Sequence, residues 1–245
     1  MDKKLYVYGI RPVLELLESK KEIDTIYLQK DLKTEWSIIV RETSKKRNIN
    51  LKLVPKHKLN RLTKKYHQGV IGLASHIQFQ NFENLLSSIF DQGKFPLFLL
   101  LDRITDVRNF GSICRSAEAM GVDGILIPKK ESAQINEIAI KASAGAIANI
   151  HICRVDNLVQ SVKIAKDNGL TVLSCSEKGS KLINKINLNK PILIIIGSER
   201  NGISQNLINI SDEIGKIATT GKTASLNAAV ASAIILFEYN RQKHN

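Results

Sequence analysis

The stretch that decides the fold is Pro191-Ile-Leu-Ile-Ile-Ile-Gly-Ser-Glu-Arg-Asn-Gly202. Its apolar run, Ile192 to Ile196, has no polar alternation, which is typical of a strand buried on both faces of a parallel sheet. The strand stops at Gly197, and a polar turn follows. Ligands of open α/β sheets bind beyond the carboxyl ends of such strands. Gly197 would let a ligand approach the backbone and Glu199 places a carboxylate at the rim, so the turn is either part of a site or a plain connection to a helix.

A second buried strand, Leu97 to Leu101, and a regular alternation of strand and helix patterns surround this stretch. Such alternation predicts an α/β fold with a mostly parallel sheet and helices on both of its faces. The further strands are predicted at Gly124 to Ile127, Ile150 to Cys153, Leu170 to Cys175 and Glu213 to Ile217.

The first part of the chain predicts a separate, small α/β domain over residues 1–75. Its helix Thr34 to Arg47 would turn Trp36, Ile39 and Val40 inward. Residues 76–95 are interpreted as a linker that carries a short helix, Asn81 to Phe90, and residues 96–245 as the main domain.

Charge is concentrated in the small domain. Residues 1–75 hold 17 Lys and Arg against 8 Asp and Glu, whereas residues 76–245 hold 19 against 15. This surplus favours a polyanion such as RNA as the partner, although a lysine-rich composition throughout the chain is the alternative. No apolar run approaches the roughly 20 residues that span a bilayer, and no signal peptide is evident, so no membrane contact is expected. The three cysteines lack metal or CxxC spacing, which is typical of free thiols in the cytoplasm.

Three polar segments follow predicted strands: Asn109-x-Gly-x-x-x-Arg115, Gly197-Ser-Glu-x-x-Gly202 and Ser225-Leu-Asn227. A helix is predicted to begin at Asn109 as its N-cap, with Asn109, Ser112 and Arg115 on one face. A final helix is predicted from Ser225, as its cap, to about Arg241. The segments match neither the GxGxxG fingerprint nor a complete P-loop, and the sequence has no metal-ligand cluster. A nucleotide-binding dehydrogenase is therefore disfavoured, and no metal is expected.

These three segments, in this order and spacing, resemble the three motifs of the SpoU-type (TrmH-like, SPOUT superfamily) RNA ribose 2′-O-methyltransferases. The chain is most similar to the 23S rRNA guanosine enzymes of that family, and the resemblance extends to the Gly9 helix and to His67-Gln68-Gly69. It implies S-adenosylmethionine as methyl donor, RNA as substrate and a deep trefoil knot in the main domain. One departure is Ile217-Ala-Thr-Thr, where many relatives carry Ile-Pro-Met.

The resemblance also implies roles for single residues. Its active-site positions fall on Asn109, Arg115, Glu199, Ser225 and Asn227, and its cofactor-binding positions on Gly197, Ser198, Gly202, Ile217 and Leu226. Because a guanidinium does not deprotonate in proteins, we expect Arg115 to stabilise charge or hold a phosphate rather than act as the base.

Three further expectations concern partners and alternatives. RNA contact is predicted for Arg11, His67 and Gln68, in turns made tight by Gly9 and Gly69. Small residues on the final helix predict a homodimer built on the main domain. The alternatives are a tRNA guanosine methyltransferase and a non-catalytic RNA-binding protein of ribosome assembly. The intact set of polar residues favours an enzyme, since a pure binder has no need of them.

Overall fold

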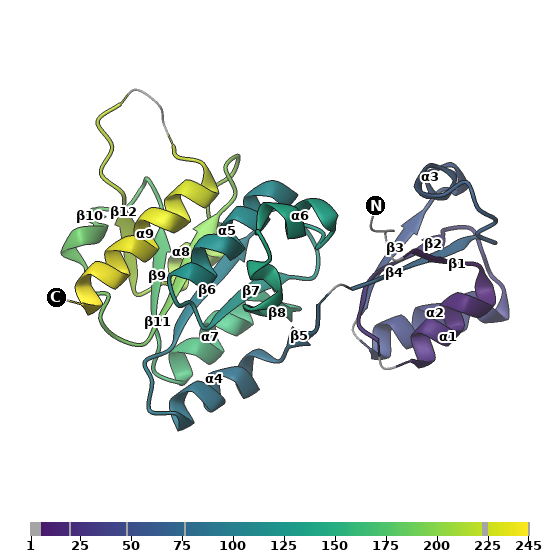
Figure 1. The fold of residues 1–245 in the computed structure, drawn as a ribbon, viewed down its shortest axis with the longest axis horizontal. Helices are drawn as coiled ribbons and strands as arrows, with labels where there is room; N and C mark the ends of the chain where they lie inside the picture. Colours follow the sequence, from purple (N-terminus) through teal and green to yellow (C-terminus); the bar gives the residue numbers. More distant parts are fainter. Residues whose placement is uncertain (1–5, 20, 48, 76, 222–224, 245) are drawn as a thin grey trace. The chain divides into compact units, whose positions relative to one another are not determined.

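The computed structural model describes residues 6–19, 21–47, 49–75, 77–221 and 225–244. The chain forms two compact units (Figure 1). The first holds residues 1–78 with 135–137, and the second holds 79–134 with 138–245.

The first unit is a four-stranded mixed sheet in the order β1-β4-β2-β3, with helices on both faces. Among the strands described in this unit, β2 pairs with β3 in parallel, and β4 pairs antiparallel with β1 and β2. Helices α1 and α2 pack on one face of the sheet and α3 packs on the other. Its elements are β1 (Tyr6–Tyr8), α1 (Ile10–Glu18), β2 (Ile23–Gln29), α2 (Glu35–Lys46), β3 (Asn50–Val54), α3 (Lys56–Leu62) and β4 (Val70–Ala74).

One prediction for this unit was wrong. Val40 is buried and Trp36 packs at the edge of the core, but Ile39 is half-exposed. The buried face of α2 runs through Ser37, Val40 and Ser44, the spacing of one helix face. Ile39 lies one residue out of this phase.

The second unit is an eight-stranded sheet in which every pair of named strands is parallel. This confirms the mostly parallel sheet that the sequence predicted. The strand order is β10-β12-β9-β11-β6-β7-β8-β5. Its strands are β5 (Phe79–Gln80), β6 (Leu97–Asp102), β7 (Gly124–Pro128), β8 (His151–Val155), β9 (Thr171–Cys175), β10 (Lys181–Leu182), β11 (Ile192–Gly197) and β12 (Glu213–Lys216). Its helices are α4 (Phe82–Asp91), α5 (Val107–Ala119), α6 (Glu137–Ala142), α7 (Leu158–Asp167), α8 (Gln205–Ile210) and α9 (Ala228–Lys243), with short 3-10 turns at Ala146–Ala148 and Ile183–Lys185.

Helices cover both faces of this sheet. Side chains of α4, α7 and α8 form one apolar core with alternate residues of the central strands, including Phe98, Leu100, Leu193 and Ile195. On the other face α5 and α9 lie side by side, and α9 contacts β11 (Figure 1). Strands β6 and β11 are thus buried on both faces, which explains their unbroken apolar runs.

Residues 79–91, which the sequence assigned to a linker, form the edge strand β5 and helix α4. Strand β5 pairs with β8, and Phe82, Leu86 and Ile89 of α4 belong to the core of the sheet. Asn81 caps α4 by accepting a hydrogen bond from the Asn84 N–H at 2.9 Å. The amphipathic pattern that predicted this helix therefore reflects a face that packs on the main sheet.

The carboxyl ends of β6, β9, β11 and β12 meet at one edge of the sheet, because all four strands are parallel neighbours. The polar segments that follow these strands are therefore brought together. The trefoil knot implied by the resemblance stays a prediction. Over the described residues, no helix has the length and apolar character needed to cross a bilayer. The same residues contain no group of three His, Cys, Asp or Glu side chains that could hold a metal ion.

Candidate functional site

The carboxylate of Glu199 is the centre of a hydrogen-bonded cluster at this edge. Its Oε1 accepts from Asn109 Nδ2 at 2.8 Å and from Asn227 Nδ2, and Asn227 Nδ2 also contacts Asn109 Oδ1 at 3.0 Å. The Ala228 N–H lies 3.4 Å from the same Glu199 oxygen. One residue from each of the three polar segments thus meets at a single point.

Two helix starts present the amides of this cluster. Asp106, not Asn109, caps α5: its carboxylate accepts from the N–H groups of Arg108 and Asn109 at 2.9 and 2.8 Å. The predicted cap was wrong because both residue types can cap, and the chain leaving β6 turns into the helix at Asp106. Asn109 lies in the first helical turn, so its side chain is available to Glu199.

The start of α9 was also predicted wrongly. Asn227, not Ser225, caps this helix, with Oδ1 accepting from the Ala229 and Val230 N–H groups at 2.9 and 3.3 Å. One end of the amide therefore holds the helix while the other end binds Glu199. The helix N-terminus carries partial positive charge, which stabilises a carboxylate placed there.

The loop after β11 closes on itself. The Gly202 N–H donates to the Ser198 carbonyl at 2.8 Å, and the Asn201 N–H donates to Ser198 Oγ at 3.3 Å. A Cβ on Gly197 would lie 2.2 Å from the Gly202 carbonyl carbon. Glycine is therefore required at 197 by the chain itself, whereas the sequence suggested close approach of a ligand.

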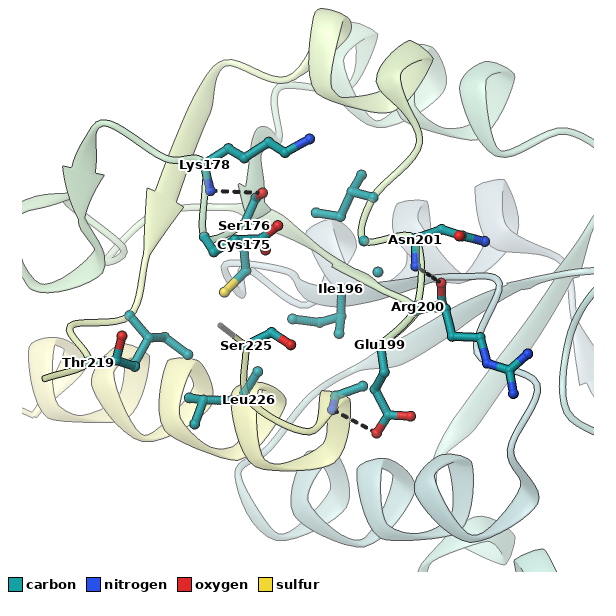
Figure 2. A pocket seen from close by; sticks show the side chains of 18 residues that line it. Cys175, Ser176, Lys178, Ile196, Glu199, Arg200, Asn201, Thr219, Ser225 and Leu226 are labelled. Atoms are coloured by element: carbon teal, nitrogen blue, oxygen red, sulfur yellow. Dashed lines mark hydrogen bonds between the residues drawn. The ribbon is translucent and has the colours of Figure 1, made fainter. Parts of the chain in front are cut away.

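A cavity of about 420 Å³ lies among the loops that follow β9, β11 and β12. The structure places all five predicted cofactor-binding residues in its wall: Gly197, Ser198, Gly202, Ile217 and Leu226. Figure 2 shows Ile196, Ser225 and Leu226 around the hollow and Glu199 pointing toward the start of α9. Residues 175–178 also line it, and the sequence reasoning did not select them. The signal for them was the polar loop that follows the buried strand β9.

A second hollow, of about 520 Å³, lies on the other side of Glu199. Glu199 lines both hollows, together with Ser198, Arg200 and Asn201. Asn109, Arg103 and Thr105 line the second hollow but not the first. A carboxylate bound by two amides therefore stands at the boundary between two spaces, each large enough for a small ligand or a nucleotide.

Asp102 and Arg103 brace the loop, and the sequence reasoning missed both. The Asp102 carboxylate is buried and accepts from Arg103 Nε and Nη2, each at 3.0 Å, and from the Ser204 N–H at 2.6 Å. Arg103 also donates to the Gly202 carbonyl at 3.3 Å. Hydrogen bonding to Asp102 raises the pKa of Arg103 above its ordinary value. The available signal was a charged pair that ends an otherwise apolar strand.

Arg103 adopts an unusual backbone conformation, with a φ of 59°. This left-handed region is uncommon for residues other than glycine, asparagine and aspartate. Such a conformation costs free energy and persists only where the surrounding structure holds it. Here the bidentate pair with Asp102 and the bond to Gly202 hold Arg103 in place.

Arg115 lies apart from this cluster. It is exposed on α5 and is not among the described residues that line either hollow. Asn109 and Ser112 line a groove between α5 and α9. The structure therefore joins three of the five predicted active-site residues, Asn109, Glu199 and Asn227, by hydrogen bonds. It places Ser225 in the wall of the first hollow and leaves Arg115 on the open face of its helix.

The predicted RNA-binding residues lie in the first unit. Gln68 Oε1 accepts from the Ile10 N–H at 2.9 Å, which ties the turn after α3 to the start of α1, where Arg11 is exposed. His67 is only 6 % exposed. Its Nε2 contacts Asn60 Oδ1 at 2.8 Å, and its Nδ1 accepts from the Gly69 N–H at 3.0 Å. The structure gives His67 the role of holding the turn, which differs from the predicted RNA contact.

Two family models match the chain. Residues 96–237 match the SpoU rRNA Methylase family, and residues 6–80 match RNA 2′-O ribose methyltransferase substrate binding. The chain is 30 % identical over 239 residues to YacO of Bacillus subtilis (strain 168), whose name places it in the TrmH family of tRNA/rRNA methyltransferases. That match covers 98 % of this chain and 96 % of YacO.

Two solved structures share the fold over nearly the whole chain. The SpoU methyltransferase AviRb from Streptomyces viridochromogenes, in complex with AdoMet, has a TM-score of 0.62 and 23 % identity, covering 98 % of this chain and 90 % of that one. An AdoMet-bound rRNA methyltransferase from Sinorhizobium meliloti has a TM-score of 0.61 and 24 % identity, covering 96 % and 86 %. At these identities the likeness establishes the fold.

Proposed function

We propose that this chain, which belongs to the SpoU rRNA methylase family, methylates a ribose 2′-hydroxyl of RNA at the Glu199 cluster. The chain is an RNA methyltransferase that uses S-adenosylmethionine as methyl donor. The observation that carries the assignment of the site is the position of Glu199, which lines both hollows. One hollow would hold the donor and the other the ribose that receives the methyl group.

The first hollow suits S-adenosylmethionine. Its volume of about 420 Å³ lies in the range of small-molecule sites. Its wall combines apolar side chains, Ile196, Ile217 and Leu226, with polar loop residues after β9 and β11. Apolar walls suit an adenine ring, and loop N–H and C=O groups suit its polar edge. When bound, the cofactor would supply a methyl group carried by a positively charged sulfur. An oxygen nucleophile can attack the methyl carbon and displace the sulfur.

We assign Glu199 the task of positioning groups at the boundary. Two amide donors engage one of its oxygens, so the carboxylate is held in one orientation. A fixed negative charge there would favour a positively charged sulfur on one side and accept a hydrogen bond from a ribose hydroxyl on the other. Holding two reactants in near-attack geometry can lower a barrier by roughly 7–11 kcal/mol at best. Asn109 and Asn227 hold Glu199, and Ser225 offers a hydroxyl in the cavity wall.

The substrate we propose is a guanosine of 23S rRNA. The family model over residues 96–237 is that of rRNA methylases, and the surplus of positive charge lies in the unit that matches a substrate-binding model. A tRNA guanosine is the alternative, favoured by the mention of both RNA classes in the name of the B. subtilis relative.

Two measurements test this function. Calorimetric titration with S-adenosylmethionine should show binding, and binding should weaken when Leu226→Asp places a charge in the cavity wall. Purified protein should then transfer labelled methyl groups to rRNA from a strain that lacks the gene. Mapping of ribose methylation in rRNA and tRNA from that strain identifies the nucleotide. Cofactor binding without transfer to any RNA would leave a non-catalytic RNA-binding protein as the function.

We also propose a homodimer that pairs through α5 and α9. An open groove between these helices is lined by the apolar residues Met120, Val230, Ile234 and Phe237, and Phe237 is 60 % exposed. Apolar surface of this kind on a protein typically marks an interaction site. The groove reaches Asn109 and Asn227, so pairing would border the Glu199 cluster, and each subunit's exposed Arg115 lies on the same helix α5.

Mass and complementation test the pairing. Light scattering at micromolar concentration should give twice the chain mass of 27.3 kDa, and Phe237→Glu should reduce it. If Arg115 acts in the partner's site, mixing the inactive Arg115→Ala and Glu199→Ala proteins should restore part of the activity. A monomeric mass that does not depend on concentration would reject the dimer.

A further inference from the structure

We propose that the face of the first unit that carries α3 binds an unpaired nucleotide of the substrate RNA, with Tyr66 as the side chain on which the base stacks. We call this surface the α3 face and define it by the exposed residues Lys52, Lys56, Lys58, Arg61, Lys64, Lys65 and Tyr66. The inference rests on the proposed function, because it takes RNA to be the substrate.

Tyr66 is unusually exposed. Its relative exposure is 84 %, the highest among the large hydrophobic side chains that the structure describes. A single exposed aromatic ring is not in itself a sign of binding. Here a binding role is indicated by the cationic residues around Tyr66 and by the hydrogen bonds that hold its loop.

The residues around Tyr66 are cationic. Residues 56–66 contain five Lys and Arg and no Asp or Glu, and all five are exposed. Lys52 extends the charge onto β3, where it precedes Val54 by two residues and shares its side of the strand. Val54 packs in the same apolar cluster as Leu59 of α3. The side of the unit that carries α3 therefore presents several exposed cations, which suit the phosphate groups of RNA.

The loop that carries Tyr66 is held on both sides. Before it, Thr63 Oγ1 accepts from the Lys65 N–H at 3.1 Å. After it, His67 binds Asn60 and Gly69, and the Val70 N–H donates to the His67 carbonyl at 2.9 Å. Gln68, with a φ of 52°, reaches the start of α1. Because these hydrogen bonds already hold the loop backbone, binding of a base on Tyr66 would cost little conformational entropy.

Charge and shape together favour an unpaired base over other ligands. A protein partner would be expected to cover a broader apolar area than one ring among lysines. A fully paired RNA helix keeps its bases stacked inside. Its phosphates could bind the cations, but it offers no base to stack on the ring of Tyr66. Unpaired bases are recognised by stacking on aromatic side chains within cationic surfaces.

The test compares two RNA probes on the full chain. One is a short hairpin with an unpaired loop, and the other is a fully paired duplex of similar length. Stacking contributes about 1–3 kcal/mol per base, so Tyr66→Ala should weaken hairpin binding by about 5- to 150-fold. Tyr66→Phe should restore binding, and neither variant should change duplex binding. Phe95→Ala removes another exposed ring, 58 % exposed and at the amino end of β6, and should have no effect.

The salt dependence separates stacking from charge. Lys64→Gln should lower the slope of log K against log salt by about 0.7, the value for one phosphate on a single strand. Tyr66→Ala should leave that slope unchanged. Equal hairpin affinity of wild type and Tyr66→Ala would overturn the proposal, as would an equal loss on hairpin and duplex. Failure of the proposed function looks different: the wild type would then bind the hairpin through Tyr66 but methylate no RNA.

Discussion

Asn227 Nδ2 lies 3.0 Å from Asn109 Oδ1, and this contact ties the start of α9 to the first turn of α5. Both amides also donate to the same oxygen of Glu199. The cluster therefore joins two helix starts and the loop after β11 into one unit. Substitution of any member should therefore disturb the geometry of the site more than the stability of the sheet, because the apolar core of the sheet does not include this cluster.

Glu199→Ala should abolish most of the activity while leaving the protein folded. The substitution removes the acceptor of two amides at the rim of the cavity, where lost hydrogen bonds cost about 1 kcal/mol of stability. The loss in kcat should be on the order of 100-fold or more, the effect of removing one group that stabilises a transition state. Methyl transfer and thermal unfolding measure the two effects. Glu213→Ala, which breaks an exposed pair with Lys181, is the control and should retain activity.

Gly197→Ala should destabilise the protein and weaken cofactor binding. The added methyl group would meet the Gly202 carbonyl carbon at 2.2 Å and the Ile203 nitrogen at 2.3 Å, so the loop must move. Overpacking of this kind typically costs 1–3 kcal/mol. Gly221→Ala should be close to neutral, because no heavy atom of the described residues, apart from the chain neighbours, lies within 4 Å of the new group. Equal melting temperatures for the two variants would contradict this account.

Asp102→Asn should lower cofactor affinity by loosening the loop after β11. The variant loses the ion pair with Arg103, and its amide can no longer accept from Arg103 and Ser204 with a full negative charge. Charge-assisted bonds are roughly twice as strong as neutral ones, so we expect a loss of about 1–3 kcal/mol in stability. Calorimetry with S-adenosylmethionine and urea unfolding test this. Unchanged affinity would show that the loop does not depend on the brace.

Arg115→Ala should abolish methylation, because we expect the Arg115 guanidinium to stabilise charge or hold a phosphate of the RNA. The fold should stay intact, because Arg115 is exposed on α5. Arg115→Lys should fail as well, since an ammonium cannot reproduce the planar fork of a guanidinium. Arg108→Ala, another exposed arginine of α5, is the matched control and should lose less activity. Turnover at the wild-type rate in the lysine variant would remove Arg115 from the reaction.

The first unit should lose stability as the pH falls below about 6.5. Burial, and then the nearby charge of Lys56, lower the pKa of His67 from its ordinary value of 6.5. The unfolded chain then binds more protons than the folded one, so stability rises with pH through this range and falls on acidification. Protonated Nδ1 would also lose the bond from Gly69. NMR titration of the ring should show a pKa below 6.5, and a value above it would contradict the buried environment.

The sequence by itself determined the architecture. The runs Leu97 to Leu101 and Ile192 to Ile196 predicted doubly buried parallel strands, and the structure confirms both. Such predictions succeed because a strand buried on two faces must be apolar at every position. The three polar segments were also visible, because polar residues directly after buried strands are local features of the chain.

Only the tertiary structure decided which side chains meet and what each one does. Asp106 and Asn109 are both good caps, and the path of the chain out of β6 selected Asp106. Gly197 is required by its close contact with Gly202 and Ile203, and His67 is held by Asn60 and Gly69. These outcomes depend on contacts between segments that pack together, such as Asn109 with Glu199, 90 residues apart. Local patterns limit which contacts are possible, but packing and the pairing of buried polar groups select the ones that form.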